Sequence, residues 1–162
     1  MSKVGLASVF SAVQCLILLA ITYGPIGFTS DFFTMFSILT LTSISSLALG
    51  LTLSALVKSN EAAMGLIPIV LIPQFLLAGY IQPLKELGTI LEYLTPVMIS
   101  RWGFEAVMIL ENPKYPSSYP VQSQQDYLYA LGMQPDNMII DIAMLGLLTI
   151  GFILTLFGLL KL

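Results

Sequence analysis

Charged side chains in this 162-residue chain are almost confined to the gaps between four long apolar runs. The runs cover residues 4–23, 32–57, 62–81 and 138–160, and of the fifteen charged residues only Asp141 lies inside one of them. A helix of about 20 apolar residues crosses the roughly 30 Å hydrocarbon core of a bilayer. The pattern predicts an all-α integral membrane protein with four transmembrane helices in a single domain, residues 1–162.

Composition excludes several classes of function. Hydrophobic residues make up 57% of the chain, charged residues 9%, and the net charge is −3, so there is no basic surface for nucleic acid. The chain has no histidine and one cysteine, Cys15, which rules out an internal disulfide or a Cys/His metal site. The first run is too long for the apolar core of a signal peptide and no small-residue cleavage site follows it. We expect Gly24-Pro25 to end this first helix.

The second apolar run is rich in hydroxyl groups. Small residues recur there at every fourth position and draw one ridge along a helix face: Thr42, Ser46, Gly50 and Ser54. Such ridges allow helices to pack closely in lipid. The same ridge could instead form a polar wall along a substrate path, and the sequence leaves both interpretations open.

Four further residues in the apolar runs are candidates for packing or for lining a pathway. Pro68 and Pro73 should bend the third helix, because each removes a backbone donor, and Gln74 follows in the same region. Gln14 is the corresponding polar candidate in the first run.

Residues 82–137 carry nine of the fifteen charges. Residues 83–93 have the pattern of a short amphipathic helix, and Thr95-Pro96 resembles the start of a second, apolar helix over residues 96–110. Fifteen residues are too few to span a bilayer. We therefore predict a re-entrant helical hairpin within residues 83–111, before the last span, followed by an extracytoplasmic loop over residues 112–137 with one short helix.

Arg101 and Glu105 lie one helical turn apart in this apolar segment. Ionisable groups at membrane depth are costly and normally pair or face water. The pair is predicted to fix the hairpin, with a direct role in substrate passage or gating as the alternative. Trp102 is expected to anchor at the interface, and Asp141 to interact with the N-terminal dipole of the last helix.

Orientation rests on lysines that lie next to the apolar runs. Lys3, Lys58 and Lys161 are on one side of the predicted membrane, and the acidic 82–137 stretch is on the other. The positive-inside rule therefore predicts a multi-pass protein of the plasma or inner membrane with both termini in the cytoplasm.

Three segments resemble the permeases of ABC type-2 transporters, the membrane domains of G-subfamily-like ABC exporters. They are LGLTLSALVKSNEAA from Leu49, LIPQFLLAGYI from Leu71, and PVMISRWGFEA from Pro96, which resembles that family's P-S-R-W-x-F-E-A segment. The resemblance implies the last four of six spans, with re-entrant helices before the final one. It also implies a second permease copy and a separate ABC ATPase that binds ATP and magnesium.

The chain itself has no phosphate-binding loop, no nucleophile–base set and no cofactor motif. The expected function is therefore a permease component, or the C-terminal part of one, that forms an export pathway with a second copy, in the lipid bilayer, without catalysis of its own. The alternative is a stand-alone four-span scaffold or regulatory protein, or a truncated permease remnant without transport activity.

Overall fold

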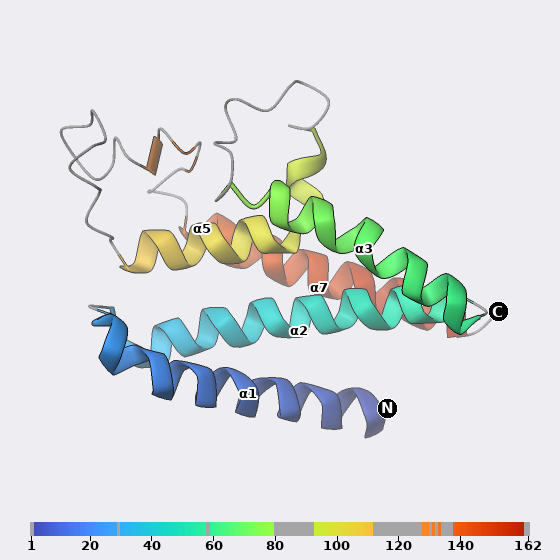
Figure 1. The fold of residues 1–162 in the computed structure, drawn as a ribbon, viewed down its shortest axis with the longest axis horizontal. Helices are drawn as coiled ribbons and strands as arrows, with labels where there is room; N and C mark the ends of the chain where they lie inside the picture. Colours follow the sequence, from blue (N-terminus) through green and yellow to red (C-terminus); the bar gives the residue numbers. More distant parts are fainter. Residues whose placement is uncertain are drawn as a thin grey trace.

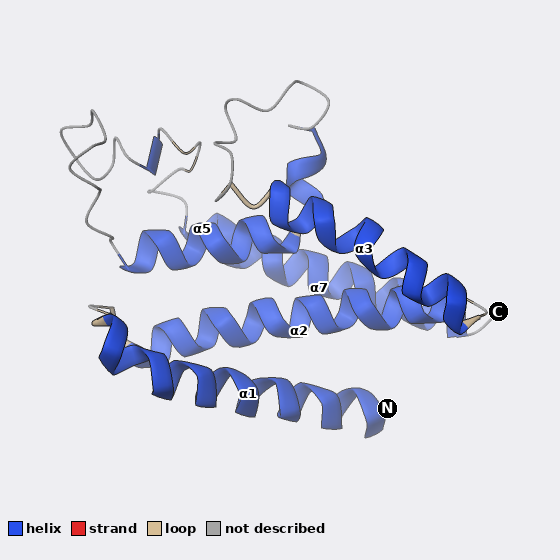
Figure 2. Cartoon of the chain, viewed as in Figure 1, coloured by secondary structure: helices blue, strands red, loops and turns tan. Residues whose placement is uncertain are grey.

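The computed structural model describes residues 2–28, 30–57, 59–79, 93–111, 128–129, 131, 133 and 138–160. Its main elements are helices, namely α1 (Ser2–Ile26), α2 (Phe32–Leu56), α3 (Asn60–Leu76), the 3-10 turn η2 (Thr95–Val97), α5 (Ile99–Glu111) and α7 (Met138–Leu160) (Figures 1 and 2). The predicted all-α membrane fold is confirmed. Within the described residues, three helices are long and apolar enough to cross a bilayer, and α3 is a shorter apolar helix.

The central element of the bundle is α2, which contacts α1, α5 and α7. The contact between α2 and α7 is the most extensive in the described part of the chain, and α1 packs mainly on α2. The chain begins and ends at the same end of the bundle (Figure 1).

The first helix continues beyond its predicted end. Gly24-Pro25 does not stop it, because Pro25 lies in the last turn, where a missing backbone donor costs one helical bond. The helix ends at Ile26, since Gly27 takes a left-handed conformation with φ of 73° and donates to the carbonyl of Tyr23 at 3.2 Å.

The next two helices begin at side-chain caps. Asp31 accepts a hydrogen bond from the backbone N–H of Thr34 at 3.0 Å, and Ser59 accepts one from that of Ala62 at 3.2 Å. Only a short connection separates α2 from α3, because α2 ends at Leu56 and α3 begins at Asn60. The two capping residues in it, Val57 and Ser59, are both extended.

The packed core lies between α2, α5 and α7. Hydroxyl groups of α2 reach across to α7: Ser45 Oγ lies 2.5 Å from Thr149 Oγ1, and Thr52 Oγ1 donates to the carbonyl of Phe152 at 3.0 Å. Ser45 and Thr52 are both buried. Small hydroxyl residues therefore join these two helices closely, as expected in lipid.

The start of the predicted apolar helix before the last span also differs. Thr95 and Pro96 belong to η2, Met98 is extended, and the helix begins only at Ile99. Trp102 is not an interfacial anchor, since it is buried against Ile99 and Leu145 in the core. The predicted helix over residues 83–93 and the loop over residues 112–137, apart from residue 93 and a few loop positions, lie outside the described residues.

Candidate functional site

A pair of reciprocal hydrogen bonds joins the end of α3 to the beginning of α5. The side-chain oxygen Oε1 of Gln74 accepts from the backbone N–H of Ser100 at 3.0 Å. In return, the hydroxyl of Ser100 donates to the backbone carbonyl of Gln74, with Oε1 also in reach at 2.9 Å. Backbone donors at a helix start and carbonyls at a helix end have no partner within their own helix. Each helix here supplies the partner that the other lacks.

These two helices together extend over the length of α2. The short turn before Asn60 sets the start of α3 beside the end of α2, and Ser30, just before α2, donates to Glu111 Oε2 at the far end of α5 at 2.7 Å. With 17 and 13 residues, α3 and α5 are about 25 Å and 20 Å long. Both are shorter than the roughly 30 Å hydrocarbon core of a bilayer, and Gln74 and Ser100 lie where the two helices meet.

The third apolar run therefore differs from the predicted span over residues 62–81. Its helix ends at Leu76, and Gly79 follows with φ of 88°, which a helix cannot contain. The helix is continuous through Pro68 and Pro73, and the carbonyl of Pro73 accepts from Leu77 N at 2.9 Å as a cap. The bend predicted at these prolines stays a prediction.

A cavity of about 380 Å³ lies where α2, α3 and α5 meet. Its polar lining comes from Thr42, Ser46, Gln74 and Ser100, and aliphatic and aromatic side chains complete the wall. A second cavity of about 280 Å³ shares Gly50 and Ile67 with the first and extends along α2 and α3. Ser54 lines this extension. Because α3 makes its main contact with α5 and little with α2, the two cavities form one groove between α2 and α3.

The predicted ridge on α2 lines this groove. A Cβ atom built on Gly50 would meet nothing within 4 Å. Within this chain the ridge is therefore not a close-packing surface, at least at Gly50. The close approach occurs at Gly103 of α5, where a Cβ would lie 2.6 Å from Thr42 Cγ2 and 2.7 Å from its Oγ1. A role of the ridge in a pathway stays a prediction.

The two charged candidates lie on α5 and line neither cavity of the groove. Arg101 Nε lies 3.7 Å from Glu105 Oε2, and the guanidinium also donates to Thr95 Oγ1 at 2.9 Å and covers the ring of Trp102 at 4.5 Å. The exposed fraction of Glu105 is only 2%. The geometry fits an ion pair that holds η2 and α5 together, although its importance for folding remains a prediction.

Asp141 of α7 lies near these two residues, whereas the sequence predicted only an interaction with the N-terminal dipole of its own helix. It is 1% exposed and lies within electrostatic range of Glu105 and Arg101. The only sign of this in the sequence was that Asp141 is the one charged residue inside an apolar run. Periodicity could not show that α5 would lie against this point of α7.

Three predicted residues, Gln14, Pro68 and Pro73, do not line the groove. Gln14 lines a surface hollow on α1 with Leu6, Phe10 and Leu47. Pro68 is in α3 but does not line the groove between α2 and α3. Of the eight candidates for packing or a pathway, five line the groove: Thr42, Ser46, Gly50, Ser54 and Gln74.

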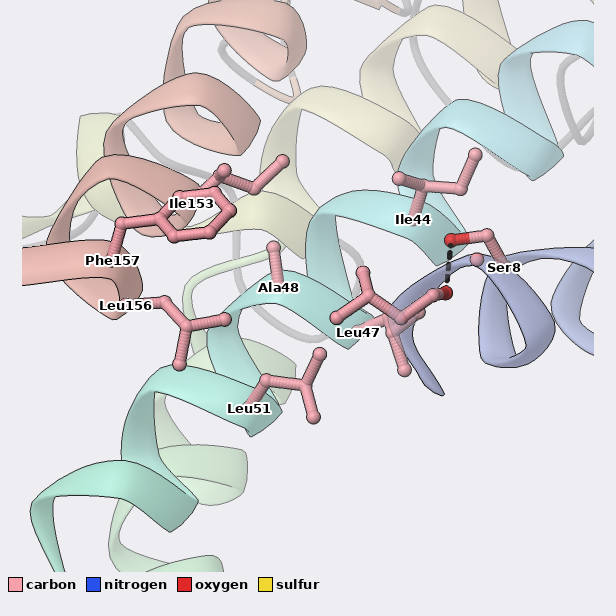
Figure 3. A pocket seen from close by; sticks show the side chains of 10 residues that line it. Ser8, Ile44, Leu47, Ala48, Leu51, Ile153, Leu156 and Phe157 are labelled. Carbon is pink, nitrogen blue, oxygen red and sulfur yellow. Dashed lines mark hydrogen bonds between the residues drawn. The ribbon is translucent and has the colours of Figure 1, made fainter. Parts of the chain in front are cut away.

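Another cavity, of about 280 Å³, opens between α1, α2 and α7 and is nearly all apolar (Figure 3). Ile44, Leu47 and Leu51 of α2 line it together with Leu156 and Phe157 of α7. The hydroxyl of Ser8 donates to the carbonyl of Val4 at 3.0 Å, as the dashed line in Figure 3 marks. This cavity offers an apolar surface of the kind that lipid chains cover, whereas the groove between α2 and α3 combines apolar walls with hydrogen-bonding groups.

A family model of ABC-2 type transporters matches residues 1–112, which include α1, α2, α3 and α5. The chain belongs to the ABC-2 type transporter family. It is a multi-pass membrane permease component of an ABC transporter, and the resemblance seen in its sequence is confirmed at the level of the family. A comparison with curated proteins gives no match.

For a permease of this family, the groove is the natural candidate for a substrate-facing surface. It lies where the end of α3 meets the beginning of α5, and ligand pockets in helical proteins commonly form between helices. The lining groups that the structure describes can form hydrogen bonds and dispersion contacts with a bound molecule.

Proposed function

We propose that this permease forms part of the translocation pathway of an ATP-driven exporter, in which the groove between α2 and α3 faces the transported molecule. The family match over residues 1–112 is the observation that carries the proposal. A bundle of this size is too small to enclose a pathway alone, so a second permease copy completes it. A separate ABC ATPase supplies the energy and holds ATP and magnesium.

The proposed orientation places both termini in the cytoplasm of a plasma or inner membrane. The first and last helices have their free ends at the same end of the bundle, which supports a common side (Figure 1). In cells with Cys15 replaced by serine, a cysteine at Ser118 should react with an impermeant thiol reagent and one at Ser59 should not. The reverse pattern would contradict the orientation.

Purification from native membranes tests the functional proposal. The affinity-tagged chain should bring with it an ABC ATPase, and the complex in vesicles should move cargo only when ATP is present. A chain that is purified without any ATPase, and that transports in its absence, would contradict the ATP-driven mechanism. ATP hydrolysis by the purified chain alone would contradict the assignment of catalysis to a partner.

A further inference from the structure

The orientation of the Gln74 amide is fixed by its partner. A backbone N–H can only donate a hydrogen bond, so the atom of Gln74 that faces Ser100 N at 3.0 Å must be the oxygen Oε1. The NH₂ group of the same amide is then left with two hydrogens and makes no hydrogen bond within the described residues. Because Gln74 lines the cavity between α2, α3 and α5, this NH₂ group is available to a bound molecule.

The hydroxyl groups that line the cavity do not donate a hydrogen bond to a bound molecule, because their hydrogens are already used within the chain. Thr42 uses its hydrogen on the carbonyl of Ile38 at 2.8 Å, Ser46 on that of Thr42 at 3.0 Å, and Ser100 on Gln74. Each of these hydroxyls therefore offers only acceptor lone pairs to the cavity. Among the described lining residues, Gln74 alone can donate.

The lining also restricts the charge of the ligand. None of the described residues around the cavity or its extension is charged, and most are apolar. An ion moved into such a site without a counter-charge would lose far more hydration energy than the site returns. A neutral molecule with a mainly apolar surface is accepted at little cost, and the combined volume suits a small organic molecule.

From these three observations we propose that the cavity binds an uncharged, largely apolar molecule through an oxygen acceptor held by the Gln74 amide. This inference deepens the proposed function, and it depends on that function only in calling the bound molecule cargo. The bilayer's own lipids do not fit the position of the donor. Thr42, which lines the same cavity, lies about 15 Å along α2 from its first turn, too deep for the ester groups of ordinary phospholipids.

Binding of a matched pair of probes tests the proposal on the intact chain. Benzophenone is a neutral aromatic ketone, and diphenylmethane has nearly the same shape with a CH₂ in place of the carbonyl. Purified chain in nanodiscs of ether-linked phospholipid, which lack ester carbonyls, is photolabelled with benzophenone, and the labelled residues are located by mass spectrometry. Diphenylmethane is then used as the competitor. No ATPase is needed, so a failure of transport and a failure of binding are separate results.

In the wild-type chain we expect saturable labelling of the cavity residues and an affinity about fivefold higher for benzophenone than for diphenylmethane, the effect of one hydrogen bond. Gln74→Met should abolish this preference, because methionine has no hydrogen-bond donor. Equal affinities of the two probes in the wild type would overturn the proposal without reference to any variant.

Two glycine substitutions locate the site. Gly50→Leu should occupy the cavity and abolish labelling by benzophenone, because space is open around Gly50. Gly151→Leu is the matched control, since Gly151 on α7 also has open space but lines none of the cavities described above, and it should bind as the wild type does. Labelling that survives Gly50→Leu would place the bound probe elsewhere and contradict the proposal.

Discussion

The two sides of α2 carry similar small and hydroxyl residues but serve different purposes. On the packed side, Ser45, Ala48 and Thr52 are buried against α7. On the open side, the residues of the ridge from Thr42 to Ser54 line the groove that faces α3. A stripe of small residues therefore identifies a helix face that another helix or a bound molecule can approach closely. It does not show which of these two will occupy the face.

The largest expected effect on stability concerns the ion pair on α5, the helix that packs against both α2 and α7. Arg101→Ala should lower stability by about 3–5 kcal/mol, because it leaves the buried Glu105 without its cation. Denaturant titration of the purified chain measures the loss. Arg101→Ala combined with Glu105→Ala should be clearly more stable than the sum of the two single losses predicts. Strict additivity would mean that the two residues do not act as a pair.

Filling the packed side should be the next most damaging change. Ser45→Leu places a large side chain between α2 and α7, where Ser45 is fully buried and bonded to Thr149. We expect a loss of about 1–3 kcal/mol, since overpacked cores force backbone shifts. The control is Ser46→Leu, one residue further along and on the open side, which should change stability much less. Equal losses would remove the distinction between the two sides.

Gly103 tests the border between the two sides. Gly103→Ala should cost about 1–3 kcal/mol, because its new methyl group would overlap the side chain of Thr42. Thr42→Ala removes the two closest atoms and should restore part of the lost stability in the double variant. If Gly103→Ala were harmless on its own, α5 would not lie as close to α2 as described.

The smallest effect on stability is expected on the open side. Gly50→Leu should change the free energy of unfolding by less than about 0.5 kcal/mol, because there is room for the new side chain. One of the two interpretations that the sequence left open, in which close packing depends on the ridge, predicts the opposite outcome. A large loss of stability in the isolated chain would restore that interpretation.

Much of the fold was predictable because apolar runs in a bilayer have few alternatives. Runs 32–57 and 138–160 became α2 and α7 almost residue for residue. The end of α3 was not predictable in the same way, since it depends on bonds between Gln74 and Ser100, which are 26 positions apart. The apolar pattern of a run does not indicate which distant residues will contact it.

The sequence predicted most residues of the site but not how they are arranged in space. Spacing predicted the ridge, the position next to Pro73 drew attention to Gln74, and the charge map drew attention to Arg101 and Glu105. Sequence could not show that α3 leaves a groove along the ridge or that Asp141 lies near Arg101, because both depend on how α5 packs. Ser45 and Thr52 belong to the same hydroxyl-rich run, and only the position of α7 distinguishes them from the ridge.

Thiol reactivity tests most directly whether the two sides of α2 differ as the structure indicates. Single cysteines are placed at Ser45, Ser46 and Gly50 in a chain with Cys15 replaced by serine, and each reacts with a small methanethiosulfonate reagent in nanodiscs. Cysteines at positions 46 and 50 should be modified readily, because they face a groove with polar groups, and the one at position 45 should be protected by α7. Fast modification at position 45 with protection at 46 and 50 would contradict the account.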